Sequence, residues 1–296
     1  MAKFSTKQLQ ALEAGKIRRN QLIKAAKKFA QADLTMDYPH SYIYSLGGLG
    51  KTYNVTKAIK ELNVPHYIVS GKTTSWGFAL QLAVIVHKKP KGIPFRIIVD
   101  DCDAILAKGF INILKNMLEG EKSLKYTQNI SDNLLDTPLK KAAYEHFKKD
   151  IGFEVPTDEL IFIFTSNSKL PTVNQALKVQ EENKGTASAQ RILDLNAIRT
   201  RCKPKDIIFA NDQEYWGWIA DAVLNDGSIS HLIDEEKQIE LLIWLWNNWG
   251  RLSGRCLRTV NQLADIMKWE EDYLDTWECD YIDYTNNSKQ LNYAGL

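Results

Sequence analysis

The sequence predicts an α/β protein in which a parallel sheet, covered by helices, is followed by a smaller helical part. Short apolar runs alternate with helical patterns as far as Ala210, and no strand pattern remains after it. A glycine-rich loop joins the first of these runs to the next helix. Strands that alternate with helices indicate a parallel sheet with helices on both faces, because each crossover between parallel strands needs a connecting helix.

Five apolar runs have the length of a buried strand and are bounded by glycine, proline or polar residues. We expect strands at residues 41–45, 66–70, 95–100, 160–165 and 206–210. A polar stretch at 120–157 holds one helical pattern, 138–149, and we interpret it as an insertion on the sheet. Residues 181–190 are polar and small, which predicts a loop.

These patterns divide the chain into three predicted parts. Residues 1–35 form a basic N-terminal helix, because apolar residues recur at helical spacing over 5–32. Residues 36–210 form the α/β core. Residues 211–296 form a helical domain that ends in an acidic, aromatic tail, and its helical patterns are 212–224, 234–249 and 254–268.

Composition places the chain among soluble globular proteins, with 44% hydrophobic and 25% charged residues. No apolar run approaches the roughly 18–20 residues of a membrane span, so we expect no membrane partner. The N-terminus is polar and basic, without the apolar core of a secretory signal. The cysteines form no CxxC pair and are interpreted as reduced thiols of a cytoplasmic protein, without a zinc site; they are Cys102, Cys202, Cys256 and Cys279.

Charge is unevenly distributed although the net charge is only +2. Residues 1–34 carry eight lysines and arginines against two acids, whereas residues 269–284 carry seven acids and no base. One interpretation is two solvated segments. The other is a subunit with a basic end and an acidic end, suited to head-to-tail packing or to a different partner at each end.

A phosphate-binding loop is predicted where the first strand meets the next helix. The pattern Gly-x-x-x-x-Gly-Lys-Ser/Thr is matched except at its first glycine, where Ser45 stands. Small residues let backbone N–H groups surround phosphates, the helix N-terminus favours negative charge, Lys51 supplies a cation, and Thr52 supplies a hydroxyl for Mg²⁺. The alternative is a glycine-rich turn that binds nothing. The residues expected to bind ATP are Ser45, Gly47, Gly48, Leu49, Gly50, Lys51 and Thr52.

Acidic and amide side chains follow two later strands, 95–100 and 160–165. Asp100 is expected to hold Mg²⁺ through water, and Asp101 to orient the attacking water. Asn167 lies at the sheet edge where ligands bind in open α/β folds, and we expect it to contact the γ-phosphate or that water. The alternatives are solvated acids at a strand end and an ordinary turn asparagine.

These pieces, in this order, resemble the AAA+ ATPase superfamily over about residues 36–268. Residues 41–52 resemble its Walker A motif, 96–101 its Walker B motif, and 161–167 its sensor 1. The resemblance implies a P-loop NTPase fold with a five-stranded parallel sheet and a C-terminal α-helical lid domain. It also implies an ATPase that binds ATP and Mg²⁺.

Two arginine segments extend the resemblance. Residues 197–202 resemble the segment that carries an arginine finger, close to the Ser-Arg-Cys form of clamp-loader subunits, with Arg201 as the finger and Arg199 as the alternative. Residues 254–258 resemble the sensor 2 segment, with Arg258 as the matching arginine. A finger that serves a neighbour in trans implies a homo-oligomeric ring, commonly a hexamer in this family. Without the resemblance, these arginines would be surface or helix-face residues.

The sequence departs from the family pattern at three places: Ser45 replaces glycine, Asp101 replaces glutamate, and 120–157 is a long insertion. Aspartate is one methylene shorter than glutamate, so we expect slower hydrolysis. The looser pattern, with Phe153 and Glu154 before the strand that carries sensor 1, resembles AAA+ ATPases encoded by phages, which would place the protein in the host cytoplasm.

An aromatic segment after the second strand is a candidate for gripping a polymer. Polymer-threading members of the family place an aromatic residue and a glycine in the ring pore, and Trp76 with Gly77 matches, beside Lys72. The alternative is that Trp76 and Phe78 pack beneath their own helix. The tryptophans of the helical domain are interpreted as lid core or subunit contacts rather than a ligand cage; they are Trp216, Trp218, Trp244, Trp246 and Trp249.

Three functions remain open from the sequence. A nucleic-acid motor or loader, such as a helicase loader or clamp-loader-like protein, is favoured by the basic N-terminal helix and by the Thr-Arg-Cys segment; DNA would contact that helix or the segment near Trp76. A protein remodeller or unfoldase is favoured if Trp76 projects into a pore. A regulatory scaffold that binds ATP to assemble, with little turnover, is kept open by Asp101.

Overall fold

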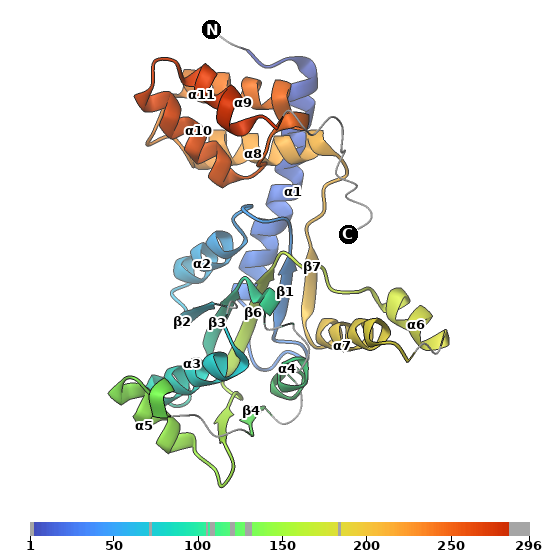
Figure 1. Ribbon diagram of the computed structural model, residues 1–296, viewed down its shortest axis with the longest axis vertical. Coiled ribbons are helices and arrows are strands. Elements are labelled where there is room, and N and C mark those ends of the chain that lie inside the picture. The colour runs from blue at the N-terminus through green and yellow to red at the C-terminus, as the bar shows by residue number, and fades with distance from the viewer. Residues whose placement is uncertain are drawn as a thin grey trace. The chain divides into compact units, whose positions relative to one another are not determined.

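The computed structural model describes residues 3–70, 73–104, 106, 110–118, 122–127, 132–182 and 185–283. Its contacts divide the chain into two compact units, whose elements are labelled in Figure 1. We call them the sheet unit, Ala25–Ser45 with Lys51–Asp206, and the helical unit, Met1–Lys24 with Leu46–Gly50 and Ile207–Leu296.

The sheet unit is built on five parallel strands in the order β2-β3-β6-β1-β7. They are β1 (Ser41–Tyr44), β2 (His66–Ser70), β3 (Phe95–Asp100), β6 (Leu160–Ser166) and β7 (Lys203–Asp206). β3 and β6 are buried along almost their whole length because each has a neighbour on both sides and helices over both faces. The predicted fold class, an α/β protein with a five-stranded parallel sheet, is confirmed.

Helices connect the strands on both faces of the sheet. The chain moves along the sheet in one direction from β1 to β2 and in the opposite direction from β2 to β7. Right-handed crossovers therefore place α2 on one face and α4 and α7 on the other. The bounds are α2 (Lys51–Glu61), α3 (Ser75–Lys88), α4 (Ile111–Leu118), α6 (Val173–Glu181) and α7 (Ala187–Arg201).

The fifth strand is not the segment that the apolar pattern predicts. β7 is a polar run that includes Pro204, whereas the prediction was 206–210. An edge strand pairs on one side only, here with β1, so proline and charged residues are tolerated in it. The apolar residues Ile207 and Phe209 are buried in the helical unit instead.

The predicted insertion at 120–157 contains a helix and a hairpin. α5 (Pro138–Phe147) lies within the predicted helical pattern and packs against α3. The hairpin strands, β4 (Ser123–Tyr126) and β5 (Phe153–Pro156), pair antiparallel and are not predicted, because four residues are too few to show an alternating pattern. Residues 120–121 and 128–131 lie outside the described residues.

The predicted loop at 181–190 is shorter than expected. α7 begins at Ala187, and the Thr186 side chain caps it by accepting a hydrogen bond from the N–H of Ala189 at 3.2 Å. Residues 187–190 are therefore helical, because a cap turns a polar run into a helix start. Residues 183–184 lie outside the described residues.

Burial at the amino-terminal edge of the sheet makes His40 sensitive to acid. Its imidazole is 7% exposed, and Nδ1 accepts a hydrogen bond from the backbone N–H of Phe162 at 3.2 Å. Burial lowers the pKa of His40 to about 4, and the positive charge of Lys122 contributes to a smaller extent. The folded chain therefore keeps this imidazole neutral.

Acidification is expected to destabilise the protein through His40. Between the ordinary histidine pKa of about 6.5 and about 4, the unfolded chain binds a proton that the folded chain excludes, so the free energy of unfolding falls by about 2–3 kcal/mol as pH falls through this window. Urea unfolding at neutral pH and near pH 4 measures this loss. His40→Asn keeps an acceptor for Phe162 without the proton site and should lose less; an equal loss in both proteins would contradict this role.

The helical unit has a tryptophan-rich core. The ring of Trp216 packs edge-on against Trp246, and Trp244 packs against Trp277, at centroid distances of 4.9 Å in both pairs. Trp216, Trp218 and Trp249 are buried, in line with the lid-core alternative, whereas Trp244 and Trp246 are half-buried. α11 lies where the sequence suggested an acidic tail. The helices are α1 (Thr6–Ala30), of which residues to Lys24 belong here, α8 (Asp212–Asp226), α9 (Glu235–Asn248), α10 (Leu257–Trp269) and α11 (Tyr273–Tyr281).

A close crossing and buried ion pairs fix α1 to α8. A Cβ placed on Gly217 would lie 1.8 Å from the carbonyl oxygen of Ala11, so only glycine permits this approach. Arg19 is 5% exposed and donates hydrogen bonds to Asp221 and Asp226. Across the described residues, no helix has both the length and the apolar character needed to cross a membrane.

Candidate nucleotide site

The carboxyl ends of three adjacent strands, β1, β6 and β3, form the edge at which the predicted site residues gather. β1 leads toward Lys51, β3 ends at Asp100, and β6 leads into Asn167. The parallel register aligns Val99 with Phe164, so the residues that follow them lie opposite one another across the two strands. This is the edge at which open α/β sheets bind ligands.

The loop that precedes α2, predicted to bind phosphate, has two glycines with positive φ. Gly48 and Gly50 both have φ of +72°, a conformation that glycine adopts without the strain a side chain would add. Within the helical unit, the carbonyl of Gly48 accepts a hydrogen bond from the N–H of Leu257 at 3.3 Å, and a Cβ on Gly48 would lie 2.6 Å from that of Cys256. A side chain at Gly48 is therefore excluded twice, by backbone angle and by space.

Lys51 is held ready as a buried cation. Its Nζ donates to the carbonyl oxygen of Ser45 at 3.0 Å and to Oδ1 of Asn167 at 2.8 Å, and the residue is 7% exposed. Burial lowers the pKa of Lys51 to about 8, while the negative charges of Asp101, Asp103 and Asp100 act in the opposite direction. A phosphate group bound beside this ammonium would add negative charge, which would favour the protonated form of Lys51 and raise its pKa.

A hydroxyl and a carboxylate meet where a magnesium ion is expected. The Thr52 hydroxyl donates to Oδ1 of Asp100, and the Thr165 hydroxyl donates to the same oxygen at 2.9 Å. The two hydroxyl oxygens are 3.2 Å apart. Mg²⁺ is bound by one or two carboxylates together with substrate phosphates rather than by an all-protein cage, and in the described part of the chain no cluster of three or more ligand side chains forms such a cage. The donor set therefore fits Mg²⁺ bound with a nucleotide.

Asp101 has an unusual backbone for a residue with a side chain. Its φ is +51°, in the left-handed region, which turns the chain sharply after β3. The side-chain amide of Asn167 donates to Oδ1 of Asp101 at 3.2 Å, while the Oδ1 of Asn167 accepts from Lys51. Asn167 thus joins the buried cation to the acid predicted to orient water.

Three consecutive residues at the end of β6 each contact one acid at or just after the end of β3. Thr165 bonds to Asp100, Asn167 bonds to Asp101, and Ser166 donates to Oδ1 of Asp103 at 2.6 Å. Sequence reasoning missed the contacts of Thr165, Ser166 and Asp103, although these polar residues stand within two positions of the predicted ones. The strand order, the glycine loop before α2 and this paired edge are the features with which known proteins are compared.

The chain has an α/β fold with a five-stranded parallel sheet and a glycine loop before α2. No model of a known protein family matches it. An uncharacterized 36.7 kDa protein in the nrdC-mobD intergenic region of Enterobacteria phage T4 is 24% identical over 239 residues, 77% of this chain, and the chain spans 65% of that relative's length. The Thermotoga maritima RuvB Holliday junction branch migration motor is similar with a TM-score of 0.42 and 16% identity, over 90% of this chain and 68% of that one.

The hydroxyl of Thr165 is expected to set the magnesium dependence of any ATP hydrolysis at this site. Thr165→Val keeps the buried shape but removes one of the donors that hold the Asp100 carboxylate. We expect the Mg²⁺ concentration for half-maximal ATP hydrolysis to rise by about 10-fold or more, as for other residues that orient metal ligands. A magnesium titration measures this, and Thr165→Ser, which restores the hydroxyl, should stay near wild type. An unchanged titration for Thr165→Val would remove this role.

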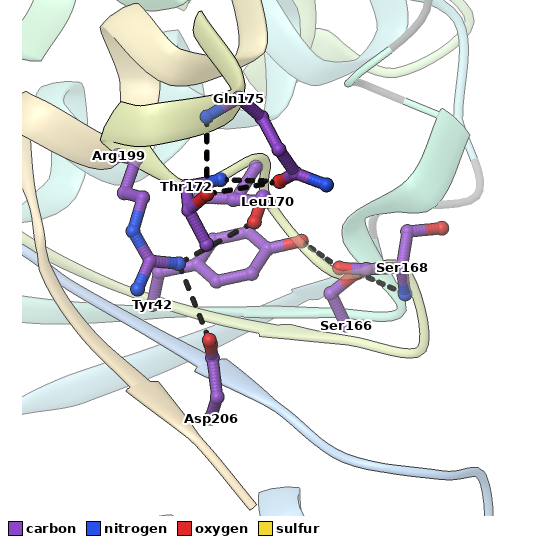
Figure 2. A network of polar contacts seen from close by, with 8 residues as sticks. All are labelled: Tyr42, Ser166, Ser168, Leu170, Thr172, Gln175, Arg199 and Asp206. Carbon is purple, nitrogen blue, oxygen red and sulfur yellow. Dashed lines mark hydrogen bonds and ion pairs between the residues drawn. The ribbon is translucent and has the colours of Figure 1, made fainter. Parts of the chain in front are cut away.

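Of the two candidate finger arginines, Arg199 is engaged within its own chain. Its guanidinium donates to the carboxylate of Asp206 at 3.3 Å and to the carbonyl oxygen of Leu170 at 3.4 Å. Figure 2 shows this network beside the bond from the hydroxyl of Tyr42 to the carbonyl of Ser168. Arg199 therefore ties the segment after β6 to β7.

Arg201 lies at the opposite edge of the sheet from Lys51. It is the last residue of α7, two positions before β7 begins at Lys203, and its guanidinium donates to the carbonyl of Ala197 at 2.8 Å. It lines a cavity of about 480 Å³ together with His40 and Lys122. Parallel strands of four or more residues separate this edge from the carboxyl edge, a distance of about 13 Å or more, so the structure does not bring Arg201 to its own chain's Lys51.

Arg258 and Trp76, the other two residues singled out from the sequence, lie in different units. Arg258 is exposed in the first turn of α10, next to the segment that contacts Gly48 within the helical unit. Trp76 is half-buried and lines a groove between α3, α5 and β2, while Phe78 is fully buried. Lys72, which the sequence placed beside Trp76, lies outside the described residues.

Proposed function

We propose that this chain is an ATPase that binds ATP with Mg²⁺ at Lys51, Thr52 and Asp100 and hydrolyses it. The hydrogen bonds at the carboxyl ends of β3 and β6 support the proposal. Asn167 links Lys51 to Asp101, and Thr165 links Thr52 to Asp100. A glycine-rich turn without function would not need a buried lysine and three acids beside it.

Each residue at this edge has a role in phosphoryl transfer to water. The oxygen of the attacking water bonds to the γ-phosphorus while Asp101 accepts a proton from that water. The bond from the γ-phosphorus to the oxygen that bridges it to the β-phosphate breaks, and ADP leaves. Lys51 neutralises charge that builds on the phosphates, and Asn167 holds the water or the γ-phosphate in place. Bound Mg²⁺, held by Thr52 and through water by Asp100, would supply charge neutralisation at the β- and γ-phosphates.

We further propose that Arg201 acts as an arginine finger on the site of a neighbouring subunit. Its position at the amino-terminal edge supports this, because the length of the strands separates Arg201 from the Lys51 of its own chain. Hydrolysis then requires an oligomer, and a closed ring such as a hexamer gives each site a finger. Arg258, in the lid helix, would contact the nucleotide phosphates in the role of sensor 2.

The macromolecule on which the motor acts is proposed to be nucleic acid, in the cytoplasm. The Thr-Arg-Cys segment that contains Arg201 resembles clamp-loader subunits, and α1 carries the exposed Lys7 and Lys28, which would contact a phosphate backbone. For a protein remodeller, Trp76 would have to reach a substrate in a pore, and a half-buried indole in the groove between α3 and α5 does not favour this.

Loss of Lys51 is expected to abolish ATP binding. Lys51→Ala should weaken binding of a fluorescent ATP analogue by about 100-fold or more, because a charge-assisted contact to phosphate is lost from a buried site. Lys57→Ala, on the same helix α2 and away from the acids, is the matched control and should bind like wild type.

Hydrolysis measured with and without DNA, over a range of salt, then tests the choice of macromolecule, since DNA stimulation should fall steeply as salt rises. Failure of the wild-type chain to bind ATP would overturn the proposed function.

A second candidate function is ATP-dependent assembly with little turnover. Two observations at Asp101 favour it: the side chain is one methylene shorter than glutamate, and its carboxylate already contacts Asn167 at 3.2 Å. A chain of this kind would bind ATP and assemble, yet hydrolyse too slowly for a motor. Measured turnover in the assembled state distinguishes the two functions.

A further inference from the structure

The outward face of α1 is basic and carries exposed aliphatic side chains. Leu9 is 49% exposed and Ile17 is 60% exposed, and Lys16 and Lys24 are exposed between and beyond them. The spacing of these residues places them along one side of the helix, because residues seven, eight and eleven positions apart share a face. We call Leu9, Glu13, Lys16, Ile17, Asn20 and Lys24 the α1 face.

A second surface of the helical unit has the opposite charge and its own exposed apolar residues. Glu271, Asp275 and Glu278 are exposed, and none of these carboxylates has a hydrogen bond or ion pair with a described residue. Leu274, on the same side of α11, is 46% exposed, and Trp269, at the end of α10, is 73% exposed. We call Trp269, Glu271, Leu274, Asp275 and Glu278 the α11 face.

The two faces match in composition but do not meet within one chain. Each combines large exposed apolar side chains with charges of one predominant sign, positive for the α1 face and negative for the α11 face. Lys24 has no ionic partner among the described residues, and Lys16 contacts only Glu13, at 3.7 Å on its own helix. A contact between copies would neutralise both faces and cover Trp269.

We propose that the α1 face of one copy docks on the α11 face of a second copy. In this contact Leu9 and Ile17 pack against Trp269 and Leu274, and the lysines of α1 pair with the carboxylates of α11. The surface joins two different patches of the same chain, so each copy offers one free face of each kind. Such heterologous contacts propagate, and they close into a ring when the rotation between copies permits.

A second copy fits the α1 face better than nucleic acid does. A phosphate backbone is recognised by positive charge. Binding to it would not explain why Leu9 and Ile17 are exposed on the same face as the lysines. Glu13, on the same face, would repel phosphate but is compatible with a protein partner. The contact is separate from the finger proposed for Arg201, because that residue lies in the sheet unit, and it does not depend on ATP hydrolysis.

Charge reversal tests the contact directly. Sedimentation velocity of the full chain, without nucleotide, should show self-association that weakens as ionic strength rises from about 0.02 M to about 0.3 M. Lys16→Glu with Lys24→Glu, and separately Glu271→Lys with Asp275→Lys, should each weaken association by about 10-fold or more. An equimolar mixture of the two variants should associate again, because each supplies the native face that the other lacks. A single chain with all four changes should also recover, because its reversed faces are again complementary.

Three results would overturn the proposal. They are no self-association of wild type at about 100 µM and low salt, no recovery in the mixture or the fourfold variant, and an equal loss in the control Lys91→Glu with Lys149→Glu, which changes two exposed lysines of the sheet unit. If the α1 variant loses DNA binding while association stays at the wild-type level, the face belongs to nucleic acid and the contact between copies is wrong. ATP binding by each variant, expected at the wild-type level, shows that a failure here leaves the proposed ATPase site intact.

Discussion

Arg201→Ala is expected to lower the rate of ATP hydrolysis by about 10³–10⁵-fold while leaving ATP binding near wild type. Negative charge on the transferring phosphoryl group grows in the transition state, so an arginine aimed at it affects kcat more than ground-state binding. Arg201 lies at the amino-terminal edge of the sheet, so the proposed finger would act on the site of another subunit.

Mixed oligomers test whether the finger acts in trans. Arg201→Ala and Lys51→Ala subunits should both be inactive alone, but a mixture contains sites with Lys51 from one chain and Arg201 from its neighbour. Steady-state hydrolysis should therefore recover partly, with a maximum at intermediate ratios. No recovery at any ratio, although mixed oligomers form, would exclude shared sites.

Arg199→Ala is the matched control for the finger. This arginine lies two residues away on α7 but already pairs with Asp206 and Leu170. Its loss should lower the free energy of unfolding by about 1–2 kcal/mol, because a half-buried ion pair and a backbone bond disappear. The hydrolysis rate per folded subunit should change by less than about 10-fold. A larger loss of rate for Arg199→Ala than for Arg201→Ala would exchange the two assignments.

The core strands were predictable because burial on both faces leaves a continuous apolar run. β3 and β6 have such runs, and their ends were predicted to within a residue. β7 was misplaced because an edge strand needs no apolar run, while the apolar residues after it pack in the helical unit. α11 was missed because its apolar stripe is reduced to Trp277 and its neighbours among many acids.

The site was predictable where the chemistry fixes a residue type and not where the fold chooses a partner. Lys51, Thr52 and Asp100 follow from a motif with set spacing. That Thr165 holds Asp100 follows from the register in which Val99 faces Phe164, and register is a property of the folded sheet. That Arg199 pairs with Asp206 likewise depends on the folded sheet, because it joins α7 to β7.

Asp101→Asn is expected to lower the rate of hydrolysis by about 10²–10⁴-fold, the usual contribution of a general base. Asparagine has the same size and tolerates the left-handed backbone, so the turn at φ +51° should be preserved. ATP binding should stay within about threefold of wild type, since Lys51, Thr52 and Asp100 are unchanged. Single-turnover hydrolysis with enzyme in excess separates this chemical step from product release.

The outcome for Asp101 also decides between a motor and an ATP-dependent scaffold. If the variant hydrolyses ATP as fast as wild type, Asp101 does not accept the proton of the water. A slow wild-type rate together with that result would favour a scaffold that binds ATP in order to assemble. Asp101→Glu provides the opposite test. Its longer side chain reaches further toward the γ-phosphate, but glutamate accommodates the left-handed backbone less well than aspartate. A faster variant would show that reach limits the wild-type rate, whereas a slower one would show that the sharp turn after β3 is matched to the shorter acid.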